Sequence, residues 1–219
     1  SDLIDLHSAL KGGRTNAIKL YWEADDNTQC AFVDIKSLYP YIQNCMAYPL
    51  HHPEIITVNV GPLETVHLRY KGLFACTVLP PPKLYLPLLH YSTRGKLIFP
   101  LCKRCADVGG NTPCTHTNPK DREFYGIYTH NELIKAVNLG YKVTEIFEIY
   151  SWKEWSTTMF SSYIKTFFTI KEQASGYPEY VISEKDKKVY LQKKKEEENI
   201  VLDDTKMIKN NGLRSLSKL

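Results

Sequence analysis

The chain has 219 residues, of which 43% are hydrophobic and 12% aromatic, which is enough for a buried core in one large domain or in parts of two. No apolar run is long enough to cross a bilayer, and the N-terminus lacks the charged-then-apolar pattern of a secretory signal, so we expect an intracellular protein with no membrane partner. The net charge of +4 is too mildly basic to identify a nucleic-acid-binding protein, so partners must be inferred from particular residues.

The first informative residues are the glycine pair Gly12-Gly13 and the neighbouring Arg14. Paired glycines permit positive φ and let a nucleic-acid backbone approach closely, and an arginine can contact a phosphate. A contact with a DNA backbone is therefore one interpretation of the pattern. A flexible turn is the alternative interpretation of the pair.

A strand-to-helix junction is predicted next. Residues 30–33 are apolar and alternate as in a buried strand, and Ser37 can cap a helix that tolerates Pro40 in its first turn. Asp34 lies at the junction, where a carboxylate that can hold a divalent cation is next to free N–H groups that can bind phosphate oxygens. The junction is thus a candidate site for a metal-chelated nucleotide. The alternative is an aspartate at a strand end beside a serine cap, without any chemistry.

Apolar alternation predicts strands between residues 54 and 78, and the proline run 80–82 ends that unit. Farther along, Thr129-x-x-Glu132 forms a capping-box pattern before an apolar helical stretch that Gly140 stops. A β-rich run follows at 142–150. We therefore expect an α+β fold.

Cys102-x-x-Cys105 and Cys114-x-His116 supply four metal-capable side chains within one short segment. The two pairs can meet in tetrahedral geometry, which predicts a structural zinc site. Free thiols in a reducing compartment are the main alternative, and a redox pair is the third. Four protein ligands would close such a zinc site to catalysis.

Helical spacing recurs from residue 152 onward. An aromatic stripe predicts an amphipathic helix that packs into the core, with Lys171 at the end of the stripe. A break at 175–178 leads to the charge block 193–198, which predicts a solvated helix or a mobile loop. A second helix is predicted from about Thr205 to the end, with Arg214 and Lys218 on one face. The stripe consists of Trp155, Met159, Tyr163, Phe167 and Ile170.

The heptapeptide 34–40, Asp-Ile-Lys-Ser-Leu-Tyr-Pro, resembles motif A of family B DNA polymerases. Residues 11–15 resemble the Tyr-x-Gly-Gly element between the exonuclease and polymerase domains of the protein-primed branch, with Leu10 at the aromatic position. The stretch from 94–100 through 171–176 looks like the polymerases of Polinton/Maverick elements and related viruses. Residues 212–219 resemble the opening of motif B, and the sequence has no Asp-x-Asp of motif C. The resemblance thus implies a polymerase fragment.

The resemblance also implies a domain organisation for this fragment. Residues 1–86 would be the N-terminal part of an incomplete palm, and 87–150 an insertion similar to terminal-protein region 1, which contains the cysteine and histidine pairs. Residues 151–219 would form the fingers helices and the start of motif B. The implied activity is template-directed nucleotidyl transfer from dNTPs to a primer 3′-hydroxyl during DNA replication.

Site roles follow from the same resemblance. Asp34 and the carbonyl of Ile35 would hold Mg²⁺ in a two-metal site, and the N–H groups of Ser37, Leu38 and Tyr39 would bind the triphosphate. Tyr39 would also act as the steric gate against ribonucleotides, for which a core aromatic is the alternative. The basic fingers residues Lys171, Arg214 and Lys218 would clamp the β- and γ-phosphates, while DNA would contact Gly12, Gly13 and Arg14.

The implied partners are a DNA template and primer, dNTPs and a terminal protein primer, in the nucleus or at a viral replication site. Because motif C is absent, the fragment alone is expected to be inactive. A different function remains open, that of a noncatalytic, zinc-stabilised module that binds nucleic acid or protein through its charged segment.

Overall fold

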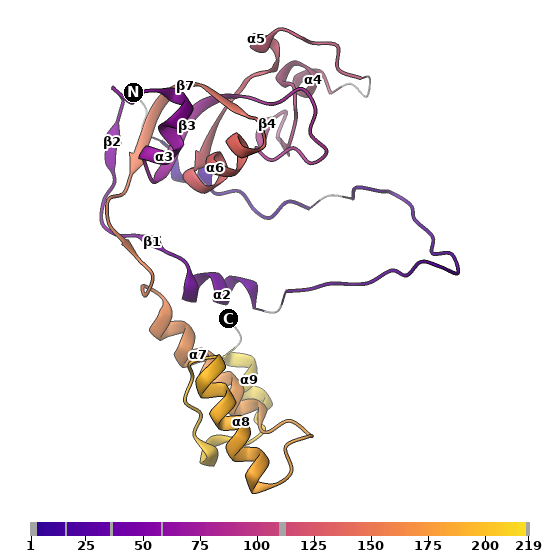
Figure 1. Cartoon of the computed structure of the whole chain (residues 1–219), viewed down its shortest axis with the longest axis vertical. Coiled ribbons are helices and arrows are strands. Elements are labelled where there is room, and N and C mark those ends of the chain that lie inside the picture. The colour runs from indigo at the N-terminus through magenta and orange to yellow at the C-terminus, as the bar shows by residue number, and fades with distance from the viewer. Residues whose placement is uncertain (1–3, 16, 36, 58, 110–112, 218–219) are drawn as a thin grey trace. The chain divides into compact units, whose positions relative to one another are not determined.

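The computed structural model describes residues 4–15, 17–35, 37–57, 59–109 and 113–217. The chain forms two compact units, one of residues 1–21 and 49–154 and the other of residues 22–48 and 155–219 (Figure 1). Helices and strands both occur, as expected for an α+β protein. Within the described part of the chain, no helix combines the length and the apolar character needed to span a membrane.

The first unit is built on a four-stranded antiparallel sheet with the strand order β2-β7-β3-β6. Its central strand β3 pairs with both β6 and β7, so Phe74 lies opposite Tyr128 on one side and Ile149 on the other. The strands are β2 (Glu54–Ile56), β3 (Gly72–Leu79), β6 (Phe124–Thr129) and β7 (Lys142–Ser151).

The main core lies on the face of this sheet that α3 (Val66–Arg69) and α6 (His130–Asn138) cover (Figure 1). Alternate residues of β3 point into this core, because successive side chains of a strand face opposite sides of the sheet. Phe74 is fully buried there. The core consists of Val66, Phe74, Cys76, Val78, Leu89, Phe124, Tyr128, Leu133, Ala136, Tyr141 and Ile149. A smaller apolar cluster on the opposite face of the sheet includes Ala9 of α1 (Leu6–Ala9).

Most local predictions for this unit are confirmed. The strands expected between 54 and 78 are β2 and β3, although η1 (Leu63–Thr65) and α3 lie between them. The capping box is complete, since the Glu132 N–H donates to Thr129 Oγ1 and the Thr129 N–H donates to Glu132 Oε2. Helix α6 ends before Gly140, whose φ is +91°, and the β-rich run is β7.

A tight hairpin and two short helices complete the first unit. Strands β4 (Tyr91–Thr93) and β5 (Lys96–Ile98) are joined by Arg94 and Gly95, both with positive φ as a two-residue type I′ turn requires. Helix α4 (Lys103–Val108) follows, and α5 (Pro119–Arg122) precedes β6.

The predicted domain boundary at residue 86 falls inside this unit. Strand β3 lies before the boundary and pairs with β6 and β7, which lie after it. Compactness divides the chain at 21/22, 48/49 and 154/155, and the assignment of palm, insertion and fingers stays a prediction. The short strands β1 (Tyr48–Pro49) and β8 (Trp155–Ser156) mark the last two of these boundaries.

The second unit is helical. Helix α7 (Ser161–Ser175) contacts α2 (Leu38–Cys45) and α9 (Asn211–Leu216). Helix α8 (Glu184–Glu197) and η2 (Asp204–Lys206) lie between α7 and α9 in the sequence. A small core of Ile200, Leu202 and Met207 packs against Phe168 of α7 and Tyr190 of α8.

Several predictions for this unit are wrong in detail. Helix α7 begins at Ser161 rather than near residue 152, and Trp155 belongs to β8. The aromatic stripe is not the core face, because Met159 and Tyr163 are exposed, whereas Ile164 and Ala174 are the residues of α7 that are buried. The final helix, α9, begins only after Asn210, whose side chain caps it.

The charge block at 193–198 is also not uniformly solvated. It lies at the end of α8 as a helix, which is one of the two predicted forms. Within it, Lys194 Nζ is 2.8 Å from Glu172 Oε2 of α7 and 2.7 Å from Glu198 Oε1, and its side chain is largely buried. One lysine of the block therefore ties α8 to α7.

The strand predicted at residues 30–33 is absent. Residues 30–35 have no strand assignment and are exposed, with Phe32 96% and Val33 83% accessible. A strand needs a neighbour for its backbone hydrogen bonds. Among the described residues none pairs with this segment, so the apolar alternation alone does not produce a strand.

Candidate functional site

Asp34 lies at the end of this extended, exposed segment. Its carboxylate and the neighbouring Ile35 carbonyl precede the first turn of α2, as the sequence predicted, but without a strand before them. Lys36 lies outside the described residues. An exposed carboxylate can accept a hydrated divalent cation without the desolvation cost that a buried one would pay.

Helix α2 begins after Ser37, whose backbone conformation is unusual for the residue before a helix. Ser37 has φ +54° and ψ +39°, and its side chain makes no capping hydrogen bond, so the predicted serine side-chain cap is wrong. Its carbonyl oxygen still accepts the Tyr41 N–H at 2.9 Å, which starts the helix. Left-handed backbone is costly for a non-glycine residue and recurs at functional sites.

The first turn of α2 is well suited to bind anions. Pro40 has no N–H group, and the N–H groups of Leu38 and Tyr39 precede the first intrahelical hydrogen bond, so they are free at the N-terminal end of the helix. The Tyr39 side chain is 74% exposed, so it is not a core aromatic. Both features leave this turn accessible to a ligand.

The structure brings Ser37 together with Lys171, although the two residues are far apart in the sequence. Both line a small cavity with Pro40 of α2, Phe168 of α7 and Ser217. Lys171 Nζ is 5.9 Å from the centre of the Phe168 ring, so the lysine leans along its own helix beside the start of α2. A cation thus lies near the N-terminus of α2.

The other two basic residues of the expected clamp are not brought into this cavity by any described contact. Arg214 is an exposed residue of α9, and Lys218 lies outside the described residues. Ser217, which lines the cavity, is the described residue next to Lys218.

A larger cavity of about 370 Å³ lies between α2, α7 and the end of α8. Lys165 lines it, but so do Glu197 and Glu198, which the sequence analysis did not connect with this site. Two carboxylates repel a triphosphate, so the side of α2 that faces Lys171 is the more favourable one for an anion.

In the first unit, Gly12 and Gly13 are exposed and extended. Neither has a positive φ, and a Cβ at either position would meet no atom within 4 Å. The Arg14 guanidinium donates to the Pro87 carbonyl and stacks 4.4 Å from the centre of the Phe99 ring. Arg14 therefore contacts the segments around Pro87 and Phe99 of its own chain.

The sequence analysis missed an open hollow of about 630 Å³ in the first unit. Lys11, His90 and Lys103 line it together with Tyr125 and Phe147, whose ring centroids are 5.4 Å apart. Burial lowers the pKa of His90. Lys11 adjoins the glycine pair, which was the one signal in the sequence that pointed to this surface.

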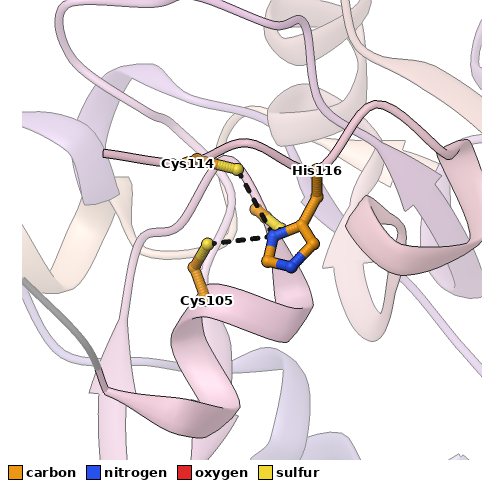
Figure 2. Close-up of side chains that lie close together, drawn as sticks. Cys105, Cys114 and His116 are labelled. Atoms are coloured by element: carbon orange, nitrogen blue, oxygen red, sulfur yellow. Dashed lines mark hydrogen bonds between the residues drawn. The ribbon is translucent and has the colours of Figure 1, made fainter. Parts of the chain in front are cut away.

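The cysteine and histidine pairs meet as predicted. The ligand atoms of Cys102, Cys105, Cys114 and His116 all lie within 4.8 Å of one another. The side chains of Cys105 and Cys114 both point toward the His116 ring, and their Sγ atoms are 3.3 and 3.7 Å from Nδ1 (Figure 2). Cys102 Sγ is 3.5 Å from the same nitrogen. The cluster is therefore compatible with a bound metal ion.

The thiols of this cluster differ in acidity. The His116 backbone N–H lowers the pKa of Cys114 to about 7, whereas burial raises the pKa of Cys105 to about 12. Neighbouring sulfurs also contribute to both shifts.

A comparison with protein families identifies the family of the chain. The family described as DNA polymerase type B, organellar and viral, matches residues 5–183. The chain belongs to this family. Type B polymerases are DNA-directed DNA polymerases and hence nucleotidyltransferases, with DNA and dNTPs as partners and divalent metal ions as cofactors. The match includes the glycine pair, Asp34, the cysteine cluster and Lys171. Curated proteins and solved structures gave no match.

Proposed function

We propose that the second unit of this type B polymerase binds the incoming dNTP, with Asp34 and the first turn of α2 on one side and Lys171 on the other. The observation that carries this proposal is that Ser37 and Lys171 line one cavity. Family membership supplies the substrate class. The geometry adds that a helix N-terminus and a lysine, which both attract phosphate, lie together.

The residues present suit a magnesium ion. Mg²⁺ is usually held by one or two carboxylates together with substrate phosphates and waters, and Asp34 offers an exposed carboxylate beside the Ile35 carbonyl. When bound, Mg²⁺ would activate the primer hydroxyl and neutralise the departing pyrophosphate. We propose Asp34 and Ile35 as its protein ligands.

The chain's own groups would orient the triphosphate. N–H groups of Ser37, Leu38 and Tyr39 would donate to its oxygens, and Lys171, Arg214 and Lys218 would neutralise the β- and γ-phosphates. These interactions would hold the α-phosphate in the position in which the primer 3′-hydroxyl can attack it. The exposure of the α2 first turn supports this role.

Tyr39 is proposed as the steric gate. Its exposed ring adjoins the N–H groups that would hold the triphosphate, where it can pack under the sugar and collide with a 2′-hydroxyl. Replacing Tyr39 with alanine should reduce the preference for dNTPs over rNTPs in binding by about tenfold, or about 1.4 kcal/mol. Unchanged discrimination would exclude this role.

The first unit is proposed to contact DNA. Gly12 and Gly13 leave open space for a nucleic-acid backbone, and Arg14 is exposed beside them. The hollow with Lys11 and Lys103 adds two cations and the Tyr125–Phe147 ring pair to this surface, beside the carboxylates of Asp5 and Glu148. We also propose priming by a terminal protein, a Polinton or viral origin, and action in the nucleus or at a viral replication site. The assignment of palm, insertion and fingers is part of the same proposal.

Nucleotidyl transfer needs a second carboxylate besides Asp34. The sequence contains no Asp-x-Asp. We therefore propose that the 219-residue chain binds a dNTP but does not extend a primer by itself. Robust primer extension by the purified chain would overturn this statement.

Nucleotide affinity tests the proposed site directly. We expect a fluorescent dNTP to bind the chain in the presence of Mg²⁺, and Lys171→Ala to weaken binding about tenfold, within the range for hydrogen bonds to charged groups. Lys188→Ala is the matched control, because Lys188 is exposed on α8 and does not line the Ser37–Lys171 cavity. Equal affinities for wild type and both variants would contradict the assignment of Lys171.

A noncatalytic, zinc-stabilised binding module is the second candidate function. The convergence of three cysteines and one histidine favours it, since a closed metal site stabilises a fold without taking part in chemistry. Such a module would bind DNA or protein with no dependence on dNTP or Mg²⁺. Magnesium-dependent dNTP binding by the second unit distinguishes the polymerase from this module.

A further inference from the structure

We propose that Cys102, Cys105, Cys114 and His116 bind one Zn²⁺, and that this ion fastens helix α4 and the β4–β5 hairpin to the loop before α5. The inference concerns the first unit and does not rest on the nucleotide site of the second. Its evidence is the arrangement of the four side chains and of the residues around them.

The spacing of the ligand atoms matches tetrahedral zinc. With Zn–S of about 2.3 Å and Zn–N of about 2.0–2.1 Å, a tetrahedral angle separates sulfur from nitrogen by about 3.5 Å. The three distances from Sγ to His116 Nδ1 are 3.5, 3.3 and 3.7 Å for Cys102, Cys105 and Cys114. These three distances thus fit one zinc ion, and all four ligand atoms lie within 4.8 Å of one another.

Hydrogen bonding does not explain this convergence. A neutral imidazole nitrogen offers either one proton or one lone pair, so Nδ1 can make one good hydrogen bond. Here three sulfur atoms approach the same nitrogen. The cysteines are not joined as disulfides either. A central cation that binds all four atoms accounts for the arrangement.

The ligand set selects zinc and a structural role. Three thiolates and one imidazole in tetrahedral geometry are typical of closed zinc sites, whereas Mg²⁺ and Ca²⁺ prefer oxygen ligands. Since all four positions are taken by protein atoms, no position is open for water or substrate. This site therefore differs in kind from the carboxylate site at Asp34.

The segment around the cluster has few buried apolar side chains to order it. Helix α4 has 6 residues and α5 has 4, and isolated helices of such length are not stable in water. Residues 113–120 are exposed except for His116. In α4 itself only Ala106 is buried. A metal cross-link between α4 and this loop would supply the missing stabilisation.

Helix α4 in turn holds the hairpin. Asp107 accepts hydrogen bonds from Tyr91 Oη at 3.0 Å and from Thr93 Oγ1 at 2.9 Å, and Arg94 donates to the Ala106 and Val108 carbonyls at the end of the helix. Arg104 of α4 is in addition 3.3 Å from Asp121 of α5. The zinc would thereby fix one connected network from β4 to α5.

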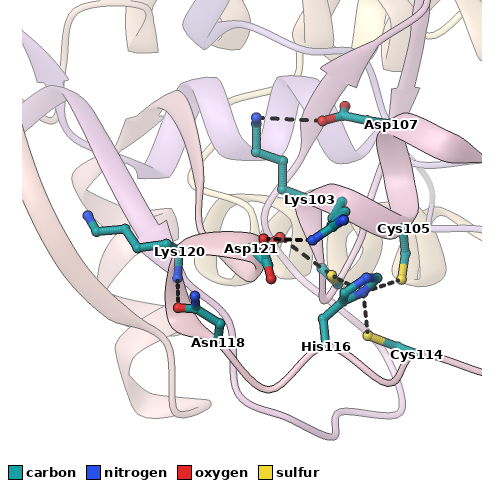
Figure 3. Close-up of polar contacts among 10 residues, drawn as sticks. Lys103, Cys105, Asp107, Cys114, His116, Asn118, Lys120 and Asp121 are labelled. Atoms are coloured by element: carbon teal, nitrogen blue, oxygen red, sulfur yellow. Dashed lines mark hydrogen bonds and ion pairs between the residues drawn. The ribbon is translucent and has the colours of Figure 1, made fainter.

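This network also forms part of the hollow in the first unit. Tyr91 of β4 and Lys103 of α4 both line that hollow. Lys103 is further held by Asp107, 3.6 Å away (Figure 3). Loss of the metal should therefore loosen one wall of the hollow while the four-stranded sheet stays folded.

Metal content of the purified chain tests the site. We expect one zinc per chain by elemental analysis, and nearly none in Cys105→Ser and His116→Ala. Cys30→Ser and Cys45→Ser are matched controls, because both cysteines are exposed and lie outside the cluster. Zinc-free wild-type protein that also fails to take up added Zn²⁺ would overturn the proposal, as would full zinc content in both cluster variants.

Two measurements on the wild-type chain keep the test valid if the cluster variants fail to fold. Replacement of zinc by Co²⁺ should give the visible absorption of a tetrahedral thiolate site, and an octahedral spectrum would contradict it. Removal of zinc by a chelator should speed amide hydrogen exchange in α4 and the hairpin by at least about tenfold, and leave α6 unchanged. Unchanged exchange in α4 would refute the fastening role. None of these results depends on nucleotide binding.

Discussion

The cysteine cluster and the Asp34 segment place their candidate ligands in opposite ways. Cys102, Cys105, Cys114 and His116 come from one short stretch and already converge. Asp34 follows an extended run in which Phe32 is 96% exposed and no described strand pairs with it. A site whose ligands are close in sequence can assemble by itself, whereas a carboxylate at the end of an unpaired segment needs neighbours from elsewhere to become a complete site.

The largest effect that separates the two regions should come from the core of the first unit. Phe74 is fully buried between β6 and β7, so Phe74→Ala should lower the free energy of unfolding of this unit by about 3–5 kcal/mol. Urea unfolding followed by circular dichroism measures this. A cost below about 1 kcal/mol would mean that this sheet is no better packed than the Asp34 segment.

The next largest effect should come from the ordered part of the second unit. Lys194 lies between Glu172 and Glu198, so Lys194→Ala should cost about 1.5–3 kcal/mol, because it leaves two partly buried carboxylates without their cation. Lys193→Ala is the control, since its contact to Glu197 is 3.9 Å long and exposed, and it should cost less than about 0.5 kcal/mol. Similar costs for both lysines would show that the α7–α8 ion pairs are not specific.

A smaller effect is expected at the capping box of α6. Thr129→Ala removes the acceptor for the Glu132 N–H and should destabilise the first unit by about 1 kcal/mol, while Thr129→Ser should retain most of the stability. Thermal unfolding of the two variants distinguishes them. Equal melting temperatures for Thr129→Ala and wild type would exclude a stabilising cap.

The smallest effect should come from the Asp34 segment itself. Phe32 makes almost no contact in this chain, so Phe32→Ala should change the free energy of unfolding by less than about 0.5 kcal/mol. The same urea titration as for Phe74→Ala gives the comparison. A loss of more than about 2 kcal/mol would show that this phenylalanine is buried in solution.

The features that the sequence predicted correctly are those set by nearby residues. The capping box at Thr129, the stop at Gly140, helix α2 with Pro40 in its first turn and the cysteine cluster all depend on contacts within a few turns of chain. The family, too, was recognisable from short motifs, and the match over residues 5–183 confirms it.

The predictions that failed depend on long-range contacts. Alternation at residues 30–33 is compatible with a strand, but pairing decides whether one forms. The stripe of α7 has helical spacing, yet packing with α2 and α9 buries Ile164 and Ala174 instead. The sequence does not distinguish Lys194 from the other lysines of the charge block, and only its ion pairs with Glu172 and Glu198 in the structure do so. The approach of Lys171 to Ser37 likewise follows from the packing of α7 on α2.

Magnesium dependence of dNTP binding is the most direct test of the proposed nucleotide site. For the wild-type chain, we predict that Mg²⁺ strengthens dNTP binding at least about tenfold, that Asp34→Asn abolishes this gain, and that Asp26→Asn retains it. Asp26 is a suitable control, because it is an exposed carboxylate in a turn of the same segment. Binding that is independent of Mg²⁺, or a gain that persists in Asp34→Asn, would contradict the assignment of Asp34 as the metal ligand.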